Sequence, residues 1–116
     1  MVFVGGITLT DKEPKALVDA IGEPATLELM AEECGELSHA CLKLARYLRG
    51  ENPTPGHSYP DLTTSLEEEM ADVYVTLREL RKIKNLIDNE RVADAIDFKR
   101  KRMYERLGVK ADSFIF

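Results

Sequence analysis

The residues best suited to chemistry are acids that interrupt apolar helical stripes. In the stretch LMAEECGEL, residues 29–37, apolar side chains recur at the spacing of a buried helix face, and Glu33 falls among them. Glu36 follows one turn later at the edge of that face, about 60° away, so both carboxylates can reach one point. Because a buried, unpaired carboxylate is costly, the pattern indicates that a cation meets these acids.

A second segment repeats the arrangement. EEMADV, residues 68–73, matches EECGEL, residues 32–37, position for position. A single copy of two acids at this spacing is typical of a solvated helix face. Two copies, each inside an apolar stripe, favour a site at the seam between two packed helices. An all-oxygen site suits a hard divalent cation, Mg²⁺ first and Mn²⁺ second. The candidate metal ligands are Glu33, Glu36, Glu69 and Asp72.

The two histidines offer a weaker alternative. Glu36 and His39 form the ExxH spacing of di-iron bundles, but such a site needs two pairs and the sequence has one. We therefore interpret His39 as a surface residue. A di-iron bundle ranks third among the functions that the sequence suggests. His57 lies in a proline-rich segment and indicates nothing specific.

Basic residues interrupt the last apolar stripe. Lys99 lies between Ile96 and Met103 on that stripe, with Arg106 at its edge and Arg102 beside it. A lysine there loses hydration unless an anion meets it or its ammonium reaches water along the long stem. We predict that Lys99 and Arg106 reach toward an anion that the metal holds.

Capping signals place four helices around these residues. We predict helices at about 11–21, 23–49, 64–87 and 91–107, with a long surface loop at 50–63. The signals are Thr10 with Glu13, Pro14, Gly22, Gly50, Thr64, Ser65 and Gly108. The expected fold is all-α, an antiparallel bundle of four to five helices. A single domain would span residues 1–116, with an N-terminal arm at 1–10 and a C-terminal tail at 108–116.

Composition and length limit the kinds of partner that the protein can have. The net charge of −5 gives no general attraction to nucleic acid or to an anionic membrane. A chain of 116 residues has too few helices to cover both faces of its two long ones, so we expect a homo-oligomer, a dimer or a tetramer. The opening residues contain neither a basic leader nor a long apolar run, so we expect a cytoplasmic location. Cys34 and Cys41 are too far apart on one helix to form a disulfide, and we interpret them as reduced core thiols.

The two acidic motifs resemble a known superfamily. EECGE at 32–36 and EMAD at 69–72, within about residues 24–106, resemble the EExxE and ExxD motifs of the MazG-like, all-α nucleoside triphosphate pyrophosphohydrolases. That superfamily also includes dimeric dUTPases and phosphoribosyl-ATP pyrophosphohydrolases. The resemblance implies Mg²⁺ at the four acids and hydrolysis of a nucleotide between its α- and β-phosphates, giving the monophosphate and pyrophosphate. It implies that Glu33 or Glu36 is the catalytic residue that accepts a proton from the attacking water. It also implies that Lys99, Arg102 or Arg106 stabilises charge on the leaving pyrophosphate.

The resemblance is incomplete at the basic segment. Members tend to carry Lys-xxx-Asn-xx-Arg, and KRKRMYER keeps Lys99 and Arg106 but has Met103 at the asparagine position. This departure is the best argument for the alternative, a non-catalytic helical oligomer that binds metal or nucleotide.

Overall fold

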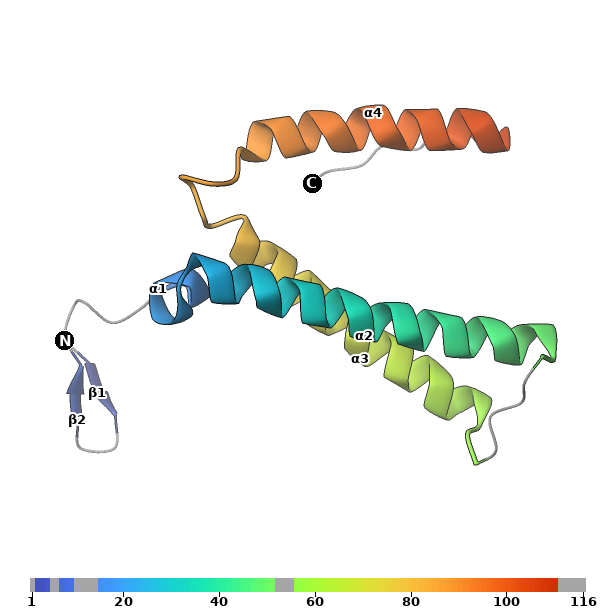
Figure 1. The fold of residues 1–116 in the computed structure, drawn as a ribbon, viewed down its shortest axis with the longest axis horizontal. Coiled ribbons are helices and arrows are strands. Elements are labelled where there is room, and N and C mark those ends of the chain that lie inside the picture. Colours follow the sequence, from blue (N-terminus) through green and yellow to red (C-terminus); the bar gives the residue numbers. More distant parts are fainter. Residues whose placement is uncertain (1, 5–6, 10–14, 52–55, 111–116) are drawn as a thin grey trace. The chain divides into compact units, whose positions relative to one another are not determined.

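The structure, a computed structural model, is built from helices that fall into two compact units, Met1–Ile83 and Lys84–Phe116. It describes residues 2–4, 7–9, 15–51 and 56–110. Over those residues the all-α prediction is confirmed, with four helices and one short hairpin, and none of the four is long and apolar enough to cross a membrane. The elements in Figure 1 are β1 (Val2–Val4), β2 (Ile7–Leu9), α1 (Leu17–Ile21), α2 (Glu23–Arg49), α3 (Tyr59–Leu80) and α4 (Asn89–Leu107).

Helix α2 has the predicted bounds. Pro24 lies in its first turn, where the missing N–H of proline costs no hydrogen bond. At the other end Gly50 adopts a left-handed conformation with φ 71°, which glycine reaches without steric penalty. The N–H groups of Gly50 and Glu51 then donate to the last carbonyls of the helix.

Helix α3 begins earlier than predicted. The Ser58 side chain accepts a hydrogen bond from the Asp61 N–H at 3.3 Å, and the Asp61 carboxylate accepts one from the Ser58 N–H at 3.2 Å. This capping box starts the helix at Tyr59, so the predicted caps at Thr64 and Ser65 are wrong, as is a loop that extends to residue 63. Pro60 lies in the first turn of this helix, and a helix tolerates proline there.

Helix α3 also ends earlier, at Leu80 rather than near residue 87. Tighter backbone bonds close its last turn, because the N–H of Lys82 donates to Glu79 and that of Ile83 donates to Leu80. The turn leaves the Ile83 side chain only 2% exposed. Burial of an apolar side chain therefore accompanies a helix end that no glycine or proline marks.

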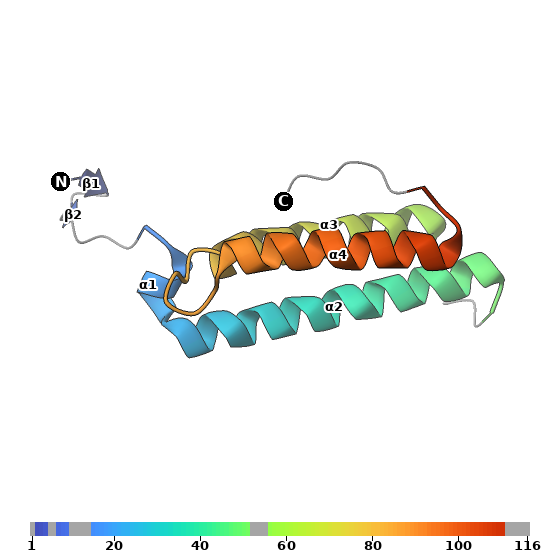
Figure 2. The same ribbon diagram turned by 90° about the horizontal axis from the view of Figure 1, so that it is seen from above.

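Helices α2 and α3 run antiparallel, side by side, in both views (Figures 1 and 2). Two buried threonines lie along this pair, Thr26 on α2 and Thr76 on α3. Each hydroxyl donates to a carbonyl one turn back at 2.7 Å, Thr26 to Gly22 and Thr76 to Asp72. The buried hydroxyls are thus satisfied within their own helices.

Helix α1 packs against this pair at the end where α3 stops. The Leu17 N–H donates to the Glu79 carboxylate at 3.0 Å, and Lys82 forms an ion pair with the same carboxylate. The helix begins at Leu17 after non-helical Lys15 and Ala16, so the predicted start was too early at these two positions. The predicted signals at Thr10, Glu13 and Pro14 lie outside the described residues.

The predicted N-terminal arm contains the two strands. Strands β1 and β2 pair antiparallel, with Phe3 opposite Thr8. Short segments rich in β-branched and aromatic residues on either side of a Gly-Gly pair are a hairpin signal, which the prediction of an arm did not include.

The second unit contains α4. The Asp88 side chain accepts hydrogen bonds from the N–H groups of Glu90, at 3.0 Å, and Arg91, at 3.2 Å. This cap starts the helix two residues before the predicted position, and Gly108 ends it with φ 68° as predicted. In the predicted tail, residues 111–116 lie outside the described residues.

The two cysteines are free, as predicted, but both are exposed, so the prediction of core thiols is wrong. They share a helical stripe with Leu27, which is 42% exposed, and Leu48, which is 66% exposed. Residues 27, 34, 41 and 48 are spaced seven apart and therefore follow one side of α2. This side lies about 60–120° away from Glu33, outside the seam with α3.

Candidate metal centre

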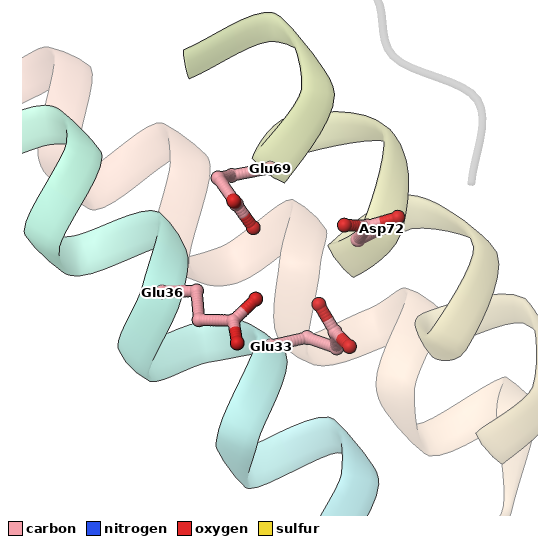
Figure 3. Close-up of side chains that lie close together, drawn as sticks. All are labelled: Glu33, Glu36, Glu69 and Asp72. Carbon is pink, nitrogen blue, oxygen red and sulfur yellow. The ribbon is translucent and has the colours of Figure 1, made fainter. Parts of the chain in front are cut away.

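Four carboxylates from two helices converge in the first unit. Glu33 and Glu36 come from α2, Glu69 and Asp72 come from α3, and their side chains point toward one another (Figure 3). One oxygen from each carboxylate lies within 4.8 Å of the others. The helical repeat of 3.6 residues explains this convergence, because each pair is spaced by three residues and so projects from one side of its helix.

The cluster lies at the edge of the helix seam. Glu33 and Glu69 are half-buried in it, whereas Glu36 and Asp72 are exposed. The Oε2 atoms of Glu33 and Glu69 are shielded from solvent and accept no hydrogen bond from any described residue. Buried polar atoms in folded proteins almost always have a partner, so these two oxygens call for a ligand.

The electrostatics of the four acids are unfavourable when no cation is present. Burial raises the pKa of Glu33, and the charges of Glu36, Asp72 and Glu32 raise it further. Burial likewise raises the pKa of Glu69, followed by the effects of the neighbouring Glu36, Asp72 and Glu33. Like charges and partial desolvation both disfavour ionisation, so a proton or a metal ion would stabilise this arrangement.

The donor set fits a hard divalent cation. All four ligand atoms are carboxylate oxygens, and two of the four carboxylates also carry a solvent-shielded oxygen with no hydrogen-bond partner among the described residues. Mg²⁺ and Mn²⁺ prefer oxygen ligands, whereas zinc sites favour sulfur and imidazole. The geometry can therefore hold a hard cation on the exposed side of the cluster, where a substrate could also approach.

A cavity of about 170 Å³ adjoins the cluster, and Glu36 and Glu69 form part of its wall. Its other polar side chains are His39, Lys43, His57, Asp61 and Ser65. Of these residues, only the two histidines entered the sequence predictions, and His39 is exposed as predicted. A signal was available for Lys43, which lies seven residues after Glu36 and so on the same side of α2.

The predicted phosphate ligands belong to the second unit. Lys99, Arg102 and Arg106 are all exposed on α4. The Arg102 guanidinium lies 5.5 Å from the centre of the Phe98 ring, a cation–π distance between side chains one turn apart. The role of these three residues toward a substrate stays a prediction.

Comparisons with protein-family models, with curated proteins and with solved structures find no match for this chain. The functional argument therefore depends on the site itself.

Proposed function

We propose that this protein is a Mg²⁺-dependent nucleoside triphosphate pyrophosphohydrolase of the MazG-like kind, which cleaves a nucleotide between its α- and β-phosphates. The observation that carries the proposal is the convergence of four carboxylates with two solvent-shielded, unpartnered oxygens. The EExxE and ExxD motifs that supply these acids support the same class. Mn²⁺ is the second candidate cation.

The residues have distinct roles in this proposal. Glu33, Glu36, Glu69 and Asp72 hold the cation, which when bound supplies positive charge to phosphate oxygens and favours deprotonation of an attacking water. Glu33 or Glu36 accepts the proton of that water, since each has a second oxygen beyond the one that holds metal. The solvent-exposed side of the cluster gives the substrate access.

Basic residues of α4 complete the proposed chemistry. Lys99, Arg102 and Arg106 would stabilise the charge that develops on the leaving pyrophosphate. The Lys99→Met variant tests this role, with an expected loss of turnover of tenfold or more, about 1.4 kcal/mol of transition-state stabilisation, at an unchanged melting temperature. Full activity of this variant would show that the Lys99 ammonium lies in solvent and does not contact a phosphate.

A second candidate function is binding of metal or nucleotide without hydrolysis. Met103 favours it, because the residue stands where the superfamily motif has an asparagine. The two candidates share the metal site and differ only in turnover.

One experiment separates them. The purified protein is incubated with Mg²⁺ and a panel of ribo- and deoxynucleoside triphosphates, and both pyrophosphate and the monophosphate are quantified. Glu33→Gln serves as the matched inactive variant. Equimolar release of both products by the parent alone supports hydrolysis, whereas saturable nucleotide binding without either product supports the second candidate.

The proposal includes a homo-oligomer, a dimer or a tetramer, with no nucleic acid or membrane partner. Large apolar side chains are exposed on both long helices, including Leu48 at 66% on α2 and Tyr74 at 63% on α3. A second copy would cover such surfaces. A monomeric mass by light scattering at micromolar concentration, with cooperative unfolding, would contradict this assembly.

A further inference from the structure

We infer that the cavity beside the four acids is a subsite for the diphosphate end of the substrate and that Lys43 is its anion-binding residue. This inference rests on the proposed function for the identity of the substrate. It assigns a phosphate contact to the α2–α3 pair itself, independently of the basic residues on α4.

The packing of α2 and α3 leaves one direction open along their seam. On one side, two turns from Glu33 and Glu69, the buried Thr26 and Thr76 occupy it. On the other side, also two turns away, Ala40 and Leu62 line the cavity. A group that extends from the cluster along the seam therefore enters this cavity.

The cavity size suits part of a nucleotide. At about 170 Å³ it is smaller than the roughly 300–1,000 Å³ of pockets that take a whole drug-sized ligand. Its polar lining includes one lysine, two histidines and the Ser65 hydroxyl, all of which can donate hydrogen bonds to phosphate oxygens. A diphosphate matches this lining, because its oxygens are anionic hydrogen-bond acceptors that these donors can meet.

Lys43 has the position and the freedom to bind an anion there. It is half-buried, and no carboxylate of the described residues lies within ion-pair distance of its ammonium, in contrast to Lys82 and Lys101, which pair with Glu79 and Asp97. Helical side chains lean toward the N-terminus of their helix, so the stem of Lys43 leans toward His39 and Glu36. Its charge would then meet the phosphates next to the cation.

Three carboxylates also line the cavity, and two of them would be neutralised by the cation. Glu36 and Glu69 belong to the cluster that would hold the cation. Asp61 accepts the Ser58 N–H of the capping box, and that bond lowers the pKa of its carboxyl, so Asp61 stays ionised and its negative charge must be offset by Lys43 and the cation. Lys43 and the cation are then the positive charges that face the cavity.

Calorimetric titration of inorganic pyrophosphate, in the presence of Mg²⁺, tests the subsite without any need for turnover. We expect Lys43→Met to weaken pyrophosphate binding at least tenfold, and Lys43→Arg to keep most of the affinity. Arg49→Met is the matched control, since it removes one positive charge from the exposed last turn of the same helix. It should change the affinity by less than twofold, and Mg²⁺ affinity and melting temperature should be preserved in all three variants.

The outcomes separate this inference from the proposed function. Hydrolysis with unchanged pyrophosphate affinity in Lys43→Met would overturn the subsite and leave the function standing. Pyrophosphate binding that depends on Lys43, without hydrolysis of any nucleotide, would support the subsite and remove the function. Failure of the parent to bind pyrophosphate, or equal weakening by Arg49→Met, would also overturn the subsite.

Discussion

Two parts of the α2–α3 seam solve the problem of a buried polar group differently. Thr26 and Thr76 are buried, and each donates its hydroxyl proton to a carbonyl of its own helix. Glu33 and Glu69 place oxygens out of solvent with no donor among the described residues. A hydroxyl can satisfy itself within a helix, whereas an ionised carboxylate only accepts and needs a hydrogen-bond donor, a proton or a cation from elsewhere. The comparison shows which part of the seam is built for a ligand.

The largest effect is expected from substitutions in the acidic part of the seam. Glu33→Gln and Glu69→Gln each remove one charge while keeping the side-chain size, so Mg²⁺ affinity should fall by about a hundredfold or more, beyond the 10–100-fold typical of outer-shell changes. Calorimetric titration of Mg²⁺ with nucleotide present measures it. Glu67→Gln, an exposed acid of α3, is the matched control, and parent-like affinity in the two site variants would rule out the four-acid site.

In the metal-free protein, the contribution of Glu33 and Glu69 to stability should fall as the pH rises. Their pKa values are raised, so these two groups bind more protons in the folded state than in the unfolded state, and their contribution is greatest below the ordinary carboxyl range. It then falls as the pH passes through the raised pKa values. Melting temperatures in EDTA across pH 4 to 8 measure this contribution as the difference between the parent and Glu33→Gln, and saturating Mg²⁺ should cancel it at pH 7. No difference in EDTA would mean that the acids are fully solvated.

A smaller effect is expected at Glu79, a carboxylate that has its partners within the chain. Its ion pair with Lys82 and the hydrogen bond from Leu17 lower the pKa of Glu79, so its contribution is present at neutral pH and is lost as the pH falls through that lowered pKa. Glu79→Gln should cost about 1.5–3 kcal/mol of unfolding free energy at pH 7. Urea unfolding with and without Mg²⁺ checks it, and the cost should not depend on the metal.

The smallest effect is expected at the threonine part. Thr76→Val removes a hydroxyl whose acceptor, the Asp72 carbonyl, is also the i−4 acceptor of the helix, so no buried group is left without a partner. The unfolding free energy should change by less than about 1 kcal/mol. A loss of unfolding free energy comparable to that of Glu79→Gln would show that the Thr76 hydroxyl stabilises the fold beyond its own hydrogen bond.

Periodicity predicted much of this seam. The bounds of α2 follow from Pro24 and Gly50, and the convergence of the acids follows from two matched motifs with one helical spacing. The start of α3 was missed because the glutamates after Thr64 and Ser65 imitate a capping box, while the actual box uses an aspartate beside a proline. Its end was missed because the stop coincides with burial of Ile83, a tertiary effect without a local signal.

The cavity was less accessible to prediction. It depends on where the first turn of α3 lies against α2, and the misplaced start of α3 put His57 and Asp61 in a long loop. Cys34 and Cys41 were misassigned for a related reason, since an apolar stripe on a helix does not reveal whether a neighbour in the same chain covers it.

The early start of α3 also affects the order in which the protein folds. Only residues 50–58 separate the two helices that hold the acids, so the ends of a short loop must meet, at a small entropic cost. Helical hairpins dominated by local contacts fold rapidly, and domains synthesised on the ribosome form from the N-terminus onward. Residues 23–80 would therefore pair before α4 is complete, which brings four repelling carboxylates together in the nascent chain. Mg²⁺ at that stage would favour the paired helices, so its binding would contribute directly to the folding free energy of the hairpin.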